Sequence, residues 1–141
     1  MKLSSVMYVP EVYLATFLKL SALIAEDNEI NVLILKNILL NVGLNVDVVE
    51  DGIQAVEAAK HRNYDIIFMD INMPLMDGIE AASIILRHKA IPIIAVTTCS
   101  GSEVKEACKV AGMVGFISKP LKVSEIHGEL IRFLCNPCLE G

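Results

Sequence analysis

The sequence predicts an α/β protein with a doubly wound parallel sheet that carries helices on both faces. Short apolar segments alternate with amphipathic ones five times along the chain, and each pair takes up about 20 residues, as expected for strand-helix units. Residues 66–69 form a continuous apolar run, which is typical of a strand buried on both faces of a parallel sheet. Parallel strands need crossover connections, and the amphipathic segments supply them.

Strands and helices are expected to alternate strictly. We expect strands over residues 21–25, 44–49, 66–69, 91–96 and 115–118, and helices over residues 31–42, 53–62, 79–88, 103–111 and 125–134. Gly43 and Gly112 follow two of the helical segments and are expected to end them, because glycine readily adopts the left-handed conformation found after a helix. Ser102 and Ser124 precede two other helices and are predicted to be their N-caps.

Periodicity also indicates which helical side chains face the core. In the helix over residues 53–62, the inner stripe is expected to comprise Ile53 and Val56, with Ala59 and Lys60 as further candidates. In the helix over residues 125–134, the inward side chains are expected to be those of Ile126, Leu130, Ile131 and Leu134.

Length and composition predict one domain. The chain has 141 residues, of which 54% are hydrophobic, enough for a single core and too few for a second domain of similar size. We expect this domain over residues 20–134, with an N-terminal extension over residues 1–19 and a C-terminal tail over residues 135–141. A formal net charge of -5 and the absence of a run of Lys and Arg argue against direct contact with nucleic acid.

Nothing in the sequence predicts secretion or direct membrane contact. The apolar stretches are shorter than the roughly 20 residues of a membrane-spanning helix, and Pro10, Glu11 and Lys19 interrupt the apolar N-terminal region, unlike in a secretory signal. A cytoplasmic location is therefore expected, in which cysteines stay reduced. Cys135 and Cys138 form a lone CxxC pair, which has no second pair to complete a metal site.

Charged and hydroxyl side chains follow four of the predicted strands at the point where each strand ends. These residues are Glu26, Asp27, Asp70, Thr97 and Lys119. The carboxyl ends of parallel strands meet at one edge of the sheet, where open α/β folds assemble their ligand sites. We therefore expect these side chains to lie close together.

This set of side chains is suited to phosphoryl transfer. Carboxylate and carbonyl oxygens are the ligands that Mg²⁺ prefers, and Mg²⁺ usually keeps several waters. Asp70 can then act as a nucleophile toward phosphorus, while Lys119 and the Thr97 hydroxyl hold the oxygens of the transferring group.

Four motifs in this order resemble the response regulator receiver domain, the CheY-like family. They are LIAEDN at residues 23–28, MDINMP with MDG at residues 69–74 and 76–78, IIAVT at residues 93–97, and GFISKP at residues 115–120. The resemblance covers about residues 20–134 and is greatest to receivers of hybrid histidine kinase phosphorelays. It implies a flavodoxin-like, five-stranded parallel sheet with strand order 2-1-3-4-5. The N-terminal extension has no counterpart in a minimal receiver, and the connection at residues 87–90 is slightly short.

The resemblance also implies a role for each site residue. Asp70 is the implied phosphoacceptor; Glu26, Asp27 and Asp70, with the backbone carbonyl of Asn72, are the implied Mg²⁺ ligands. Thr97 is the implied switch hydroxyl, Lys119 the phosphoryl-binding base and Phe116 the aromatic switch residue, and the Lys119–Pro120 peptide is implied to be cis. The implied partners are a histidine kinase or a histidine phosphotransfer protein, which donates the phosphoryl group, and a downstream protein effector. The receiver would catalyse its own phosphorylation and slow hydrolysis, then change its surface at the fourth helix, fifth strand and fifth helix.

Two other classes of function agree less well with these residues. Phosphatases of the haloacid-dehalogenase type use an aspartyl-phosphate intermediate, but they place Asp-x-Asp at the first strand, where this chain has Glu26 and Asp27. A binding module that has lost phosphorylation would not need the complete acidic set. Nucleotide binding lacks the glycine-rich phosphate loop.

Overall fold

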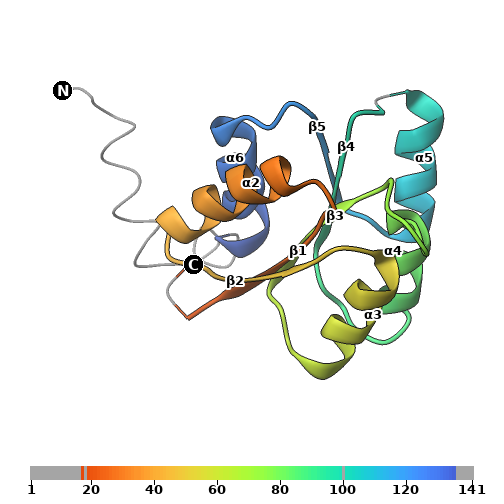
Figure 1. The fold of residues 1–141 in the computed structure, drawn as a ribbon, viewed down its shortest axis with the longest axis horizontal. Helices are drawn as coiled ribbons and strands as arrows, with labels where there is room; N and C mark the ends of the chain where they lie inside the picture. The colour runs from red at the N-terminus through yellow and green to blue at the C-terminus, as the bar shows by residue number, and fades with distance from the viewer. Residues whose placement is uncertain (1–16, 18, 100, 136–141) are drawn as a thin grey trace.

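A five-stranded parallel sheet forms the centre of the protein (Figure 1). The computed structural model describes Phe17 and residues 19–99 and 101–135. The strands are β1 (Ser21–Ala25), β2 (Asn45–Val49), β3 (Ile66–Asp70), β4 (Ile93–Thr97) and β5 (Gly115–Ser118), in the order β2-β1-β3-β4-β5. This order and the parallel pairing confirm the predicted fold class.

In the described part of the chain, five helices cover the two faces of the sheet. They are α2 (Glu29–Asn41), α3 (Gly52–His61), α4 (Gly78–Leu86), α5 (Ser102–Ala111) and α6 (Val123–Leu134). The buried side chains of α2 and α6 belong to one hydrophobic cluster, and those of α3, α4 and α5 belong to another. The sheet therefore separates a two-helix layer from a three-helix layer (Figure 1).

The middle of the sheet is fully apolar except at its carboxyl edge. Every residue of β3 and β4 is buried, which confirms the expectation of a strand covered on both faces. The edge strand β2 has no buried residue. A strand that is buried along its whole length thus carries Asp70 at its last position, at the carboxyl edge of the sheet.

Several predicted helix starts are corrected by the structure. Helix α2 begins two residues earlier than expected, because the side chain of Asn28 accepts a hydrogen bond from the Asn31 backbone N–H and caps it. Ser102 and Ser124 do not cap their helices: the N-cap residues are Gly101 and Lys122, and neither forms a side-chain capping bond. Both serines already lie within the first turn.

The inner face of α3 also differs from the predicted one. The side chain of Asp51 caps the helix by accepting from the Gln54 N–H, so the helix begins at Gly52. Its buried residues are Gly52, Ala55 and Ala59, whereas Ile53 is 46% exposed. Val56 is half-buried and Lys60 is exposed. In α6, Ile126 and Leu130 are buried as predicted, and Ile131 and Leu134 pack at the margin of the core.

The hydrophobic core extends beyond the expected start of the domain. Phe17 is fully buried and belongs to the cluster beneath α2 and α6. Residues 1–16 and 136–141 lie outside the described residues, and so does Cys138 of the CxxC pair. No helix in the described part of the chain combines the length and the apolar character needed to cross a bilayer.

Candidate functional site

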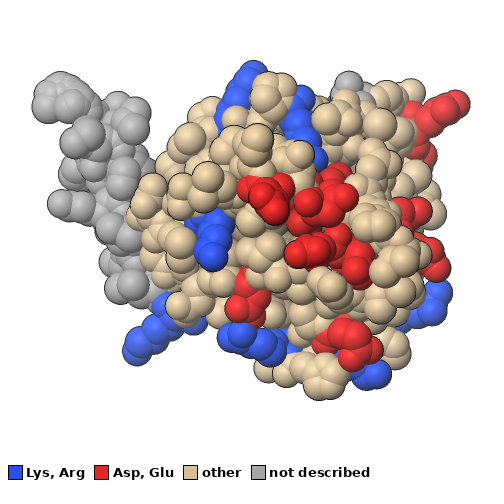
Figure 2. Space-filling model, viewed as in Figure 1, with Lys and Arg blue, Asp and Glu red and all other residues tan. Residues whose placement is uncertain are grey.

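Three carboxylates converge at the carboxyl edge of the central strands. Glu26 directly follows β1 and is 4% exposed, Asp70 ends β3 and is 5% exposed, and Asp27 is exposed. One carboxylate oxygen from each lies within 4.8 Å of the others. Figure 2 shows acidic side chains gathered near the centre of the face where the strand ends meet in Figure 1.

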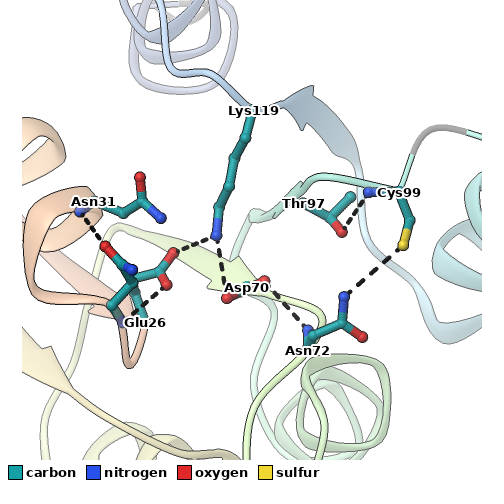
Figure 3. Close-up of polar contacts among 8 residues, drawn as sticks. Glu26, Asn31, Asp70, Asn72, Thr97, Cys99 and Lys119 are labelled. Carbon is teal, nitrogen blue, oxygen red and sulfur yellow. Dashed lines mark hydrogen bonds and ion pairs between the residues drawn. The ribbon is translucent and has the colours of Figure 1, made fainter.

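Lys119 places a positive charge between two of these carboxylates. Its Nζ lies 2.9 Å from Oε1 of Glu26 and 3.3 Å from Oδ2 of Asp70 (Figure 3). The side chain is 11% exposed and reaches the site from the residue after β5. Its backbone N–H donates to the carbonyl of Thr97 at 2.8 Å, and the peptide bond to Pro120 is cis, as the resemblance implied.

Burial and like charge raise the pKa of Asp70 to about 6 from an ordinary value of 3.8. Removal of the carboxylate from water is the largest cause, and the negative charge of Glu26 adds to it. The Lys119 ammonium and the Asn72 N–H, which donates to Oδ1 of Asp70 at 3.2 Å, oppose this rise. Burial alone would lower the pKa of Lys119, but its hydrogen bonds and charge attraction to Glu26 and Asp70 raise it above the ordinary value. Lys119 is therefore protonated, and the three carboxylates give the site an excess of negative charge.

Thr97 and Asn72 form the other side of the site. Thr97 ends β4, is fully buried, and its Oγ1 accepts a hydrogen bond from the Cys99 N–H at 3.1 Å. The side-chain amide of Asn72 is 3.9 Å from Sγ of Cys99 (Figure 3). The Thr97 hydroxyl is thus held by the loop after β4 and makes no hydrogen bond to Asp70.

Phe116 lies on the strand that leads to Lys119, but its side chain is outside the polar cluster. It is a half-buried residue of β5, paired in register with Ala95, and Lys105 of α5 places its Nζ 5.4 Å from the ring centroid. The ring therefore joins β5 to α5, the element that follows the Thr97 loop.

Two glycines let the loop after β3 approach its neighbours. A Cβ at Gly78 would overlap the carbonyl oxygen of Asp70, and a Cβ at Gly52 would overlap the carbonyl oxygen of Met76. Gly78 donates its N–H to the Ile71 carbonyl at 2.8 Å, and Gly52 donates to Met76 at 3.0 Å. These contacts fix the loop that follows Asp70 against α3 and the start of α4.

The predicted residues divide by position. Glu26, Asp27, Asp70 and Lys119 come together; Asn72 joins them through its backbone N–H; Thr97 lies at the next strand end; and Phe116 lies apart. Sequence reasoning missed Asn28, whose N–H donates to Oε2 of Glu26 at 3.1 Å, and Cys99. The position of Asn28 directly before a helical segment was the available signal for the first, whereas no pattern signalled the second.

The model of the response regulator receiver domain matches residues 22–131. The chain belongs to this family. Among curated relatives, the receiver is 33% identical to the probable histidine kinase 1 of Oryza sativa subsp. indica over an alignment 150 residues long. That match covers 82% of this chain and 16% of the rice protein, so the chain spans a small part of its relative.

Solved receivers share the fold closely. The receiver domain of the sensor histidine kinase PA1611 from Pseudomonas aeruginosa, with magnesium coordinated in its active-site cleft, has a TM-score of 0.76 and 35% identity over 83% of this chain and 98% of that one. The co-crystal structure of Saccharomyces cerevisiae Ypd1, a histidine phosphotransfer protein, with the receiver domain of Ssk1 gives a TM-score of 0.74 and 28% identity over 84% of this chain and 91% of that one. The receiver described here is therefore of the kind found in histidine kinase phosphorelays.

Proposed function

We propose that this receiver accepts a phosphoryl group on Asp70 from a phosphohistidine partner, in a reaction that depends on Mg²⁺. The observation that carries the proposal is the buried Asp70 carboxylate at the end of β3, held between an ammonium ion and two further carboxylates. This arrangement presents a nucleophilic oxygen next to both a cation and oxygen ligands for a metal. The magnesium-bound PA1611 receiver and the Ypd1 complex support the choice of metal and of partner.

The donor set fits Mg²⁺. Glu26, Asp27 and Asp70 offer only oxygen ligands, and the exposed Asp27 leaves one side of the site open to water. The Asn72 backbone carbonyl, in the loop after β3, is the fourth proposed ligand. When bound, Mg²⁺ neutralises charge on the transferring phosphoryl group and on the carboxylates.

Asp70 is the residue that forms the new bond. Its carboxylate oxygen bonds to phosphorus as the phosphorus–nitrogen bond of the phosphohistidine breaks, and the electron pair of that bond returns to the imidazole. The product is a mixed anhydride of Asp70 and phosphate. Slow attack by water on the same phosphorus returns the Asp70 carboxylate and releases inorganic phosphate, so the receiver acts as a timed switch rather than as an enzyme on an external substrate.

Thr97, Lys119 and Phe116 convert this local event into a surface change. The phosphoryl oxygens offer an acceptor for the Thr97 hydroxyl proton, and they offer the Lys119 ammonium a more highly charged partner than Glu26. Movement of Thr97 frees space into which the Phe116 ring can move, and this shifts the surface formed by α5, β5 and α6 toward the state that binds the downstream effector.

Helix α2 offers the docking surface for the phosphodonor. Ile30, Leu33 and Ile34 are 68%, 60% and 41% exposed, and they lie on one helix that begins two residues after Asp27. An exposed apolar stripe beside a reactive site indicates a protein partner rather than a solvated surface. A histidine phosphotransfer protein or kinase would bind this stripe and place its phosphohistidine over Asp70.

Intact-mass measurement tests the assignment. The receiver is incubated with Mg²⁺ and acetyl phosphate, and the phosphorylated residue is mapped by tandem mass spectrometry. We expect one phosphoryl group on Asp70, no label in Asp70→Asn, and strongly reduced label in Asp27→Asn together with weaker Mg²⁺ binding.

Asp77→Asn is the matched control. Asp77 is exposed, lies in the same loop and caps α4 by accepting from the Glu80 N–H, a role that Asn also fills. This variant should label like the wild type. Label that persists in Asp70→Asn and maps to another side chain would overturn the proposal, and so would a wild type that takes no label while circular dichroism shows it folded.

A further inference from the structure

A second concave site lies between α3 and α4, away from the acidic cluster. The cavity has a volume of about 460 Å³, within the range of small-molecule sites. Its apolar lining comes from Val56, Ala59, Ile84 and Ile85. Both helices end near it, and they lie side by side in the three-helix layer (Figure 1).

The polar groups around this cavity are basic. Lys60, His88 and Lys89 complete the lining, and no carboxylate lines the cavity. Within the described part of the chain, neither lysine lies within ion-pair distance of a carboxylate; Glu57, one turn before His61, pairs with that histidine instead. The rim therefore carries positive charge in a protein whose formal net charge is -5.

The two lysines have different tasks. Nζ of Lys89 donates to the carbonyls of Ala59 and Arg62 at 2.5 and 3.2 Å and to Oδ1 of Asn63 at 3.0 Å. These bonds use all three ammonium protons and satisfy carbonyls at the end of α3, so Lys89 contributes fixed charge. Lys60 and His88 are exposed and keep N–H donors for a ligand.

From these features we propose that the cavity between α3 and α4 binds a small amphipathic monocarboxylate. The aliphatic tail would lie against Val56, Ile84 and Ile85, and the carboxylate would accept from Lys60 and His88 within the field of Lys89. A ligand with an uncharged head group would lose the charge-assisted hydrogen bonds, and an alkyl ammonium would be repelled. The site lies toward the amino-terminal edge of the sheet, because α3 ends before β3 begins and Asp70 ends that strand. The cavity lining and the acidic site share no residue, so we expect octanoate to bind without phosphorylation.

Octanoate is the probe, with octanol and acetate as ligand controls. Titration of the ¹⁵N-labelled protein, followed by amide chemical shifts, should give saturable changes confined to the ends of α3 and α4 with octanoate. Acetate should give none, and octanol should bind more weakly by about tenfold, the cost of the charge-assisted hydrogen bonds.

Charge variants separate a built site from nonspecific adsorption. The double variant Lys60→Gln with His88→Gln should weaken octanoate binding by about tenfold and leave octanol binding unchanged. Lys36→Gln with His61→Gln, which removes the same two residue types outside the cavity, should leave both unchanged. The proposal is wrong if octanoate gives no saturable shifts up to its solubility, if its shifts map elsewhere, or if the cavity variant binds octanoate as the wild type does.

Discussion

Asp70 is a carboxylate that the fold makes harder to ionise, since it is buried beside Glu26. A group with a raised folded-state pKa contributes stability that is fully present below its unfolded pKa and is lost as pH rises through the folded pKa. For Asp70 this window runs from about 4 to about 6. Without metal, ionised Asp70 therefore destabilises the folded state at neutral pH.

We predict that metal-free Asp70→Asn is more stable than the wild type at pH 7, by an amount on the order of 2 kcal/mol, and that the difference shrinks as pH falls to about 4. Urea unfolding in EDTA at several pH values measures it. Addition of Mg²⁺ should stabilise the wild type more than the variant. A difference that is independent of pH would contradict the assigned electrostatics.

Thr97 supplies a second prediction at the scale of one residue. Thr97→Ala should still be phosphorylated, because the nucleophile and the acidic ligands stay in place, but phosphorylation should no longer shift the amide resonances of Phe116 and α5. NMR spectra before and after phosphorylation report this, with the exposed neighbour Thr98→Ala as the control. A normal response of Phe116 in Thr97→Ala would show that the two residues are not coupled.

At the scale of elements, helix caps hold the acidic loops in place. Oδ1 of Asn28 caps α2, and the N–H of the same residue donates to Glu26, so one residue both begins the helix and orients a carboxylate. Asp51 and Asp77 cap α3 and α4 in the same way. The loops after β1, β2 and β3 are therefore each tied to the helix that follows, whereas α5 and α6 have no such side-chain cap.

Asn28→Ala should lower the free energy of unfolding by about 1 kcal/mol, the usual cost of a lost N-cap. Urea unfolding gives the value. Asn37→Ala, an exposed change within α2, is the control and should not destabilise, because alanine is the better helix former. Equal stability of Asn28→Ala and the wild type would mean that the cap contributes nothing.

The sequence predicted strands better than helix starts, and the reasons are physical. β3 was recognised because burial on both faces demands a continuous apolar run, and Asp70 stood out as the acid that ends it. Ser102 and Ser124 were misplaced because serine suits both a cap and a first turn, and only the backbone decides between them. The ion pair of Lys119 with Glu26 joins residues far apart in sequence, so its distance required the fold.

At the scale of the whole molecule, the core reaches into the segment before β1. Phe17 is fully buried beneath α2 and α6, although the receiver pattern in the sequence is complete from Leu20 onward. The residues of the proposed phosphorylation site all lie after Leu20. We therefore expect stability and phosphorylation to depend on different chain boundaries.

A chain that begins at Leu20 should still be phosphorylated on Asp70 but should be less stable than one that begins at Phe17, by about 3 kcal/mol, the lower range for loss of a buried Phe side chain. Urea midpoints and Mg²⁺-dependent labelling measure the two properties. Phe17→Ala in the full chain serves as the matched control and should show a similar loss. Equal midpoints for the two shortened chains would show that Phe17 adds nothing to the core.

The close approach of Gly78 to the Asp70 carbonyl, and of Gly52 to the Met76 carbonyl, affects how this receiver can recombine with its relatives. A chimera that takes β3 from one parent and the start of α4 from another would place an Asp70 carbonyl against a Gly78 backbone from a different protein. A crossover between Gly52 and Met76, or between Asp70 and Gly78, would separate backbone segments that touch without any side chain between them. Segments exchanged among receivers should therefore keep Gly52 and residues 70–78 from the same parent.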